Sequence, residues 1–376
     1  MKIGFFTDGV PFEGDSLEKQ PLGGSESAFI SVTRALNRLG HEITAFNNCA
    51  RSAVHQGVQY HPFRSTLNRL AWEKFDVFVV SRFFGVFNIP FRAAVKVLWN
   101  HDTLDNTQVL KSVHDEIDLF LVLSAFHRDN FLTRLPQLSD RMVVTRNGLD
   151  FNLLDEASKG ARKDPHKLLY ASRPERGLKI LLEKIWPRLK QAKPELRLHL
   201  CGYQMSADYL SPELKELYSY LNLLVKSDPD IIDLGPLGKK DYYRHLAESA
   251  LLVYPCCFPE ISCLVVLEAQ ALGTPLVTTN DYALTESVKL EEFKVPGRPR
   301  TPSYWQSFVE RTLYLLNNPQ RTEKLALKAR NVIRSSYAWD QIAGEWERLF
   351  KLSLRAQSSA RDIIQTGGQR SDTLLV

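Results

Sequence analysis

Short apolar runs, rich in β-branched and aromatic residues, recur along the chain and alternate with amphipathic stretches. The runs are KIGFF, EITAF, DVFVV, AVKVLW, DLFLVL and MVVTR in the first 146 residues, then KLLYAS, LRLHLC, DIIDLG, ALLVYP and PLVTT between residues 167 and 279. Strands that alternate with helices indicate parallel sheets covered on both faces. Two such series predict an α/β protein with two doubly wound, Rossmann-like domains.

The predicted join between the domains is the polar segment DEASKGARKDPH, residues 155–166, which carries both Gly and Pro. We therefore predict an N-terminal domain over residues 1–158 and a C-terminal domain over residues 159–337. Helical segments continue to about residue 355. Residues 356–376 have little to bury and are expected to form a flexible tail.

Composition excludes several classes of protein. A hydrophobic content of 44% and a charged content of 24% are typical of globular chains. A net charge of +5, without a basic run that carries interleaved aromatics, disfavours nucleic acid as a partner. No apolar run has the length of a transmembrane helix, and Asp8 interrupts the first one, which is interpreted as a strand and not a signal peptide.

The five cysteines suit a reducing compartment better than a disulfide framework, because their number is odd and Cys256 and Cys257 are adjacent. None of the cysteines and histidines shows the spacing of a zinc site. We expect a cytoplasmic protein without a bound metal. Peripheral contact with the inner face of a membrane stays open, and so does the oligomeric state.

The stretch PCCFPEISCLVVLEAQALGTPLV, residues 255–277, is almost wholly apolar yet carries Glu260 and Glu268. A buried, unpaired carboxylate costs several kcal/mol, so internal partners or a ligand must offset each charge. The run ISCLVVLEAQAL is apolar on every face and is followed by Gly273 and Pro275, which predicts a buried helix that ends there. Glu260 then lies at the carboxyl end of a strand, the edge where open α/β sheets bind ligands.

A helix N-terminus offers free N–H groups to a phosphate, whereas two carboxylates accept hydrogen bonds from hydroxyl groups. The combination is typical of a sugar-nucleotide site. In the structural alternative, Glu260 caps the helix and Glu268 pairs with a neighbouring arginine. Sequence spacing alone leaves both interpretations open.

Three further sites carry candidate residues. Arg173 and Arg176, in SRPERGLK, follow the strand KLLYA, and the adjacent glycines of GGSES allow a close approach of backbone to a ligand. His101 follows the strand VKVLW. The alternatives are two solvated arginines, a plain turn whose Ser25 caps a helix, and a structural histidine.

PEISCLVVLEAQALGTPLV resembles the E-x7-E signature of the retaining family 4 glycosyltransferases (glycosyl transferases group 1), which have the GT-B fold of two Rossmann-like domains facing across a cleft. Six more segments follow the order of that family: PLGGSES, WNHDT, TRNGLD, SRPERGLKILLE, IDLGPLGKKDYY and YAWDQIAGEWERL. The resemblance implies that a C-terminal helix, about residues 338–355, packs back on the first domain and buries Trp339 and Trp346.

The resemblance also implies roles for individual residues. Glu260 would contact hydroxyls of the donor sugar, Glu268 the ribose, and Arg173 and Arg176 the diphosphate, while His101 would approach the donor sugar. The remaining donor contacts would come from the backbone at Gly23, Gly24, Leu237, Ser262, Cys263 and Leu264. This chain has Ile261, Ser262 and Cys263 where the family usually has glycines, which narrows the pocket above the helix.

The implied activity is that of a retaining hexosyltransferase in carbohydrate biosynthesis. It would move a sugar from UDP or GDP to a hydroxyl of a sugar, glycan, lipid-linked or other acceptor, without a required metal or other cofactor. Two alternatives stay open: an epimerase of the same fold that acts on a nucleotide sugar, and a non-catalytic nucleotide-sugar-binding protein.

Overall fold

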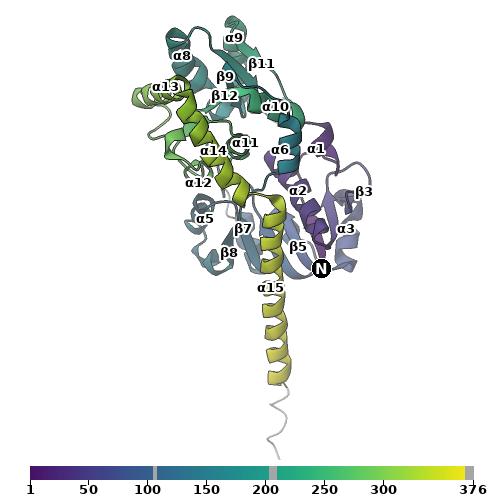
Figure 1. Ribbon diagram of the computed structural model, residues 1–376. Helices are drawn as coiled ribbons and strands as arrows, with labels where there is room; N and C mark the ends of the chain where they lie inside the picture. Colours follow the sequence, from purple (N-terminus) through teal and green to yellow (C-terminus); the bar gives the residue numbers. More distant parts are fainter. Residues whose placement is uncertain (105–107, 203–209, 369–376) are drawn as a thin grey trace, which may run out of the picture. The chain divides into compact units, whose positions relative to one another are not determined.

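The computed structural model describes residues 1–104, 108–202 and 210–368 of the 376-residue chain. These residues form two compact units (Figure 1). The first comprises Met1–Asp15, Ala28–Gly148 and the chain from Trp339 onward, and the second comprises Ser16–Ser27 and Leu149–Ala338. Each unit is built around its own mainly parallel sheet with helices packed on it, which confirms the predicted fold class of two doubly wound α/β domains.

The sheet of the first unit has eight strands in the order β3-β4-β2-β1-β5-β6-β7-β8. They are β1 Lys2–Phe6, β2 Glu42–Asn47, β3 Ala53–His55, β4 Val58–Pro62, β5 Lys74–Ser81, β6 Arg92–Trp99, β7 Leu119–Val122 and β8 Met142–Val144. β3 pairs antiparallel with β4, so the expectation of a purely parallel sheet is wrong at this edge. The two strands meet at Gln56 and Gly57, whose φ values of 47° and 81° fit a tight hairpin turn.

The helices of the first unit are α3 Phe63–Trp72, α4 Gln108–Val113, α5 Ala125–Leu132 and α15 Trp339–Gly368, together with most of α2 Gly24–Arg38. Trp346 of α15 is fully buried, its ring lies 5.0 Å from that of Trp99, and its indole N–H donates to Thr145 Oγ1 at 2.8 Å. The helix α15 continues to Gly368. Residues 356–368 are therefore helical, and the prediction of a flexible tail that begins at residue 356 is wrong for them. Residues 369–376 lie outside the described ranges.

The sheet of the second unit has six strands in the order β11-β10-β9-β12-β13-β14, all of them parallel. They are β9 Asp164–Ala171, β10 Arg197–Cys201, β11 Ile231–Asp233, β12 Ser249–Tyr254, β13 Leu276–Thr279 and β14 Lys294–Val295. The chain order reverses between β9 and β12, which are neighbours at the centre of the sheet. In open parallel sheets such a reversal opens a crevice at the carboxyl ends of the two strands.

Helices pack on both faces of this sheet (Figure 1). They are α1 Ser16–Lys19, α6 Phe151–Ser158, α7 Leu178–Ile180, α8 Trp186–Ala192, α9 Pro212–Ser227, α10 Lys239–Glu248, α11 Leu264–Leu272, α12 Leu284–Ser287, α13 Pro302–Asn317 and α14 Pro319–Ser336. α6, α10, α11 and α14 pack on one another, whereas α13 packs against α8 and the strands β12 to β14. Within the described ranges, no helix is both long enough and apolar enough to cross a bilayer.

The boundary between the units differs from the predicted join. The second unit begins at Leu149, ten residues before the predicted start at residue 159, because α6 packs against α10 and α11. The segment Ser16–Ser27 also belongs to the second unit, where α1 packs against α10. Local polarity predicted a join at residues 155–166, whereas the packing of α6 places the boundary at Leu149.

Candidate functional site

Two loops of the second unit carry five of the eleven predicted site residues, and they leave the carboxyl ends of the neighbouring strands β9 and β12. The loops are bonded to each other, since the Cys257 N–H donates to the Arg176 carbonyl at 3.1 Å. Gly177 makes this approach possible: its φ is 140°, and a Cβ there would lie 2.3 Å from the Pro255 carbonyl oxygen. The docking of the two loops places Arg176 beside Glu260.

Replacing Gly177 by alanine is expected to destabilise the protein by about 2–4 kcal/mol, because the new methyl group meets rigid backbone at a strained φ. The midpoint of urea unfolding measures this loss. Gly85→Ala is the matched control, since a Cβ at Gly85 meets nothing within 4 Å. Equal midpoints for the two variants would show that the loops are not in contact at this point.

Glu260 is 5% exposed and has two protein partners on one oxygen. Its Oε1 accepts from Arg176 Nη1 at 2.9 Å and from the Tyr254 hydroxyl at 2.7 Å. The Arg176 guanidinium also lies over the ring of Phe258, 4.1 Å from its centroid. Burial, together with the charge of Glu260, raises the pKa of Tyr254 well above its usual range, so this hydroxyl remains a donor. The negative charge of Glu260 is therefore balanced within the unit.

Glu268 lies on α11 and is 2% exposed. Its Oε1 accepts from Lys239 Nζ at 2.5 Å and from the Tyr243 hydroxyl at 2.9 Å. The Lys239 ammonium also lies over the rings of Tyr243 and Tyr242, 5.2 and 5.5 Å from their centroids. The second oxygen, Oε2, is buried and has no hydrogen-bond partner among the described residues. Glu268 is thus held by the protein through Oε1. The Tyr242 hydroxyl is also buried and without a hydrogen-bond partner among the described residues, and burial together with the nearby charge of Glu268 raises its pKa well above the usual range.

Both carboxylates therefore have internal cationic partners, as the structural alternative expects, but the details of that alternative are wrong. The residue that caps α11 is Cys263 and not Glu260, and the partner of Glu268 is a lysine and not an arginine. The sequence interpretation missed Lys239, Tyr243 and the hydroxyl of Tyr254. Lys239 and Tyr243 did carry a signal, because a spacing of four residues places them on one face of α10.

Arg173 is also paired with a carboxylate. Its Nη2 lies 2.5 Å from Glu175 Oε1, and the other oxygen of Glu175 accepts from the Tyr218 hydroxyl at 2.7 Å. The Tyr170 hydroxyl donates to the Arg173 carbonyl at 2.9 Å. The Arg173 Nε is buried and has no acceptor among the described residues. The interpretation of two freely solvated arginines does not apply to either Arg173 or Arg176.

The N-terminus of α11 adjoins the glycine loop. Cys263 is buried, Leu264 is the first helical residue, and a Cβ at Gly24 would lie 3.2 Å from Leu264 Cδ1. The helix α2 begins at Gly24, so Ser25 lies inside its first turn and is not the cap of the alternative interpretation. The structure thus brings the loop of Gly23 and Gly24 to the helix that carries Glu268.

Two further backbone positions of the predicted site belong to the same unit. Ser262 is half-buried and immediately precedes the capping residue of α11. Leu237 is half-buried against the core of the second unit, one residue before Gly238, which caps α10. Leu237 therefore lies two residues from Lys239, the partner of Glu268.

His101 belongs to the first unit, at the end of β6. Its Nε2 is buried and has no partner among the described residues, and its ring lies 4.2 Å from that of Trp99. Burial lowers the pKa of His101 well below its usual value, with a smaller contribution from the charge of Arg82, so the ring is neutral. The neighbouring carboxylate of Asp102 is engaged by Arg82, at 2.7 and 3.0 Å, and does not serve to position the histidine.

A second buried histidine of the first unit, His127, has a defined tautomer. Its Nδ1 accepts from the Leu123 N–H at 3.2 Å, so its Nε2 carries the hydrogen and donates to the Asp102 carbonyl at 2.9 Å. Both ring nitrogens are used by the neutral form. Burial accordingly lowers the pKa of His127 to about 4.

The free energy of unfolding is expected to fall by about 3 kcal/mol between pH 6.5 and pH 4 on account of His127. The unfolded chain binds a proton at this residue near pH 6.5, while the folded protein does so only near pH 4. His127→Asn keeps an acceptor for Leu123 and should show a shallower fall in urea-unfolding experiments over this range. The exposed His166→Gln serves as the control. The same slope in wild type and His127→Asn would contradict the assignment.

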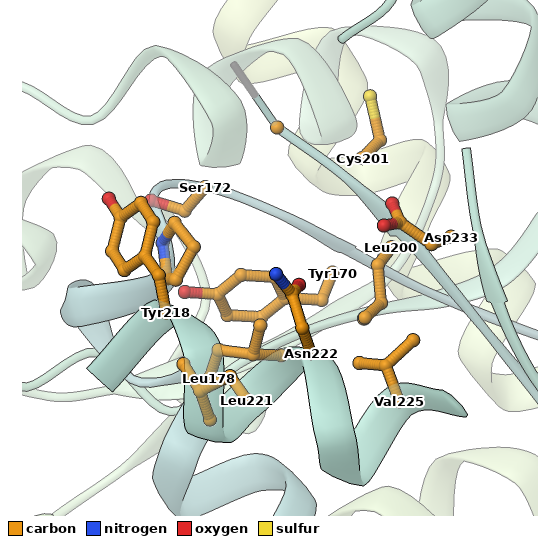
Figure 2. Close-up of a pocket in the computed structure, with 12 residues that line it drawn as sticks. Tyr170, Ser172, Leu178, Leu200, Cys201, Tyr218, Leu221, Asn222, Val225 and Asp233 are labelled. Atoms are coloured by element: carbon orange, nitrogen blue, oxygen red, sulfur yellow. The ribbon is translucent and has the colours of Figure 1, made fainter. Parts of the chain in front are cut away.

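A small pocket of about 40 Å³ opens at the carboxyl ends of β9, β10 and β11 (Figure 2). Its lining residues are Tyr170, Ser172, Pro174, Leu178, Leu200, Cys201, Gly202, Tyr218, Leu221, Asn222, Val225 and Asp233. Tyr218 and Ser172 lie at one end of the pocket, and Asp233 lies at the other. This volume holds a water molecule or two and no nucleotide. None of the predicted site residues lines the pocket, although Ser172 and Pro174 flank Arg173.

Among residues 1–104, 108–202 and 210–368, no three His, Cys, Asp or Glu side chains lie close enough together to hold a metal ion. The cationic groups that the structure places beside the two buried glutamates are Arg176 and Lys239.

Comparison with known proteins shows a similarity to one family of enzymes. The family model of glycosyl transferases group 1 matches residues 165–318, which lie inside the second unit. The matched residues include Arg173, Arg176, Leu237, Glu260 and Glu268, so the resemblance to glycosyl transferases group 1 is confirmed for the part of the chain that carries these motifs.

Curated relatives of the chain include glycogen synthase of Mycobacterium tuberculosis, 28% identical over 246 residues, which span 64% of this chain and 56% of the relative. An uncharacterized glycosyltransferase of Methanocaldococcus jannaschii is 26% identical over 236 residues, or 57% of this chain and 55% of that protein. The chain thus spans about half the length of the curated relatives it matches.

Solved structures match nearly the whole chain. Sucrose-phosphate synthase from Thermosynechococcus elongatus superposes with a TM-score of 0.74 at 14% identity, covering 95% of this chain and 100% of that one. Anabaena HepE in complex with UDP and glucose superposes with a TM-score of 0.69 at 17% identity, covering 93% and 99%. At this level of identity the likeness shows the fold, which is GT-B.

Proposed function

We propose that the protein is a retaining glycosyltransferase that takes a sugar from UDP or GDP and transfers it to an acceptor hydroxyl. The observation that carries the proposal is Glu268 Oε2, a buried acceptor without a hydrogen-bond partner among the described residues. Glu268 lies on a helix whose N-terminus adjoins a glycine loop, and the same unit holds Arg173 and Arg176. A buried oxygen of this kind is costly unless a donor meets it, and a ribose hydroxyl is such a donor. HepE, a structure of the same fold, is described in complex with UDP and glucose, which supports the choice of ligand class.

In the proposed reaction, the bond between the sugar C1 and the diphosphate oxygen breaks while the acceptor oxygen bonds to C1 on the same face. The acceptor proton passes to the leaving phosphate. Arg173, Arg176 and the backbone N–H groups at Ser262, Cys263 and Leu264 would stabilise the charge that develops on the diphosphate, a role for preorganised donors.

The other predicted residues have supporting positions in this proposal. Glu260 would contact the hydroxyls of the donor sugar, and the neutral His101 would hydrogen-bond to the sugar without adding charge. Gly23 and Gly24 would let backbone approach the leaving group, and the backbone at Leu237 would contact the base. Because the arginine and helix N–H groups would donate hydrogen bonds to the diphosphate, we propose that turnover needs no metal ion.

Product analysis tests this function. The intact protein is incubated with UDP- and GDP-sugars and a panel of sugar, glycan and lipid-linked acceptors, and products are identified by NMR. The proposal expects release of nucleoside diphosphate with retention at C1, and the same rate in the presence of a chelator. A changed sugar without acceptor would instead indicate the epimerase, and binding without any conversion would indicate a non-catalytic protein.

A further inference from the structure

Arg173 is paired with Glu175, and Glu175 is in turn hydrogen-bonded to Tyr218 of the helix α9. Glu175 Oε1 lies 2.5 Å from Arg173 Nη2, and Glu175 Oε2 accepts the Tyr218 hydroxyl at 2.7 Å. Tyr218 is on α9, 43 residues away in the chain, and only 9% of it is exposed. Because burial and Glu175 raise the pKa of Tyr218 to about 12, the hydroxyl remains a donor at every pH at which the protein would be assayed. Both oxygens of Glu175 are therefore fixed.

The charges near the site explain why the orientation of the Arg173 guanidinium matters for binding. Arg173 is matched by Glu175, and Arg176 is matched by Glu260. Each arginine and its paired glutamate together carry no net charge. We therefore expect the second unit to bind an anion here mainly through N–H groups that point toward it, and less through excess positive charge. A donor stabilises a developing charge only when it is already aimed at it. An arginine that rotates freely would lose that advantage.

We propose that Glu175 and Tyr218 are positioning residues for Arg173, and that they orient its guanidinium toward a phosphate group of the donor. This inference rests on the proposed function. Tyr218 fixes Glu175, Glu175 holds the Nη2 edge of Arg173, and the buried Nε of Arg173 has no acceptor among the described residues. Tyr218 lines the same pocket as Ser172, which directly precedes Arg173 in the chain (Figure 2). Neither residue needs to touch the ligand.

The test uses Tyr218→Phe, which keeps the buried ring and removes only the hydroxyl. A hydrogen bond to a charged group corresponds to roughly a tenfold effect or more on an equilibrium constant. We expect binding of UDP or GDP, measured by calorimetry, to weaken about tenfold, and binding of the matching nucleoside without phosphates to stay unchanged. In turnover, kcat should fall about tenfold with a smaller change in KM, because the diphosphate charge is largest in the transition state.

Tyr220→Phe is the matched control. Tyr220 lies on the same helix, and its hydroxyl donates to Glu183 at 2.9 Å, so the control loses the same type of bond away from Arg173. A double-mutant cycle adds specificity: the effect of Tyr218→Phe should vanish in an Arg173→Ala background.

Three results would overturn the inference while leaving the proposed function in place. Tyr218→Phe with wild-type affinity for the diphosphate contradicts it, as does equal weakening for diphosphate and nucleoside, which would indicate general damage to the unit. Additive effects of Tyr218→Phe and Arg173→Ala also contradict it. A wild-type protein that binds no nucleoside diphosphate would defeat the proposed function, and this inference with it.

Discussion

Glu268→Gln is expected to weaken binding of UDP or GDP at least thirtyfold, equivalent to about 2 kcal/mol. The amide has nearly the shape of the carboxylate but only one acceptor oxygen. In one orientation the amide oxygen accepts from Lys239 and Tyr243, and the NH₂ group takes the place of Oε2. In the other orientation the amide oxygen takes the place of Oε2, and the NH₂ group faces Lys239 and Tyr243, which are both donors. Neither orientation offers an oxygen acceptor both to the Lys239–Tyr243 pair and to a ribose hydroxyl, and a hydrogen bond to a neutral amide is weaker than one to a carboxylate.

The comparison with 2′-deoxy and 3′-deoxy ligands makes the experiment specific. Wild type should prefer the ribonucleoside diphosphate to at least one deoxy analogue, and Glu268→Gln should lose that preference. Glu248→Gln is the control, because Glu248 also pairs with a buried lysine, Lys167, at 3.2 Å. If Glu268→Gln retains both affinity and preference, Glu268 is only the structural partner of Lys239.

Arg176→Met is expected to produce two separate losses. The first is stability: Glu260 remains buried without its cation, which costs about 3 kcal/mol and lowers the midpoint of urea unfolding. The second is turnover, which should fall about 100-fold or more because the variant lacks a donor for the leaving diphosphate. Arg176→Lys keeps a charge but not the planar fork, so its turnover should lie between those of wild type and Arg176→Met.

Lys179→Met provides the control for charge removal close by. Lys179 is 55% exposed at its side chain and its contact with Glu183 is a loose 3.8 Å, so both stability and turnover should match wild type. A variant Arg176→Met that is destabilised yet turns over normally would remove Arg176 from the reaction and leave it as the partner of Glu260 alone.

The sequence predicted the elements of the second unit well because their signals are local. The apolar run before Gly273 predicted the buried helix α11, and Gly273 indeed ends it with a left-handed φ of 70°. The helix begins at Leu264, three residues later than the apolar pattern suggests, because Ile261 and Ser262 belong to the loop that leaves β12. Apolar composition alone does not separate a buried loop from a buried helix.

The partners of the site residues were not predictable in the same way, because they come from distant parts of the chain. Arg176 and Glu260 were both singled out, yet they lie 84 residues apart and no local pattern indicates that they bond to each other. Tyr218 reaches Glu175 across 43 residues. The unit boundary at Leu149 was missed for the same physical reason, since the packing of α6 on α10 and α11 decides it.

The most direct test of the central claim is a crystal structure of the protein with UDP or GDP bound. The account predicts a ribose hydroxyl within hydrogen-bond distance of Glu268 Oε2 and the diphosphate at Arg173, Arg176 and the N-terminus of α11. A nucleotide bound elsewhere on the protein, with Glu268 Oε2 still buried and unpartnered, would contradict it.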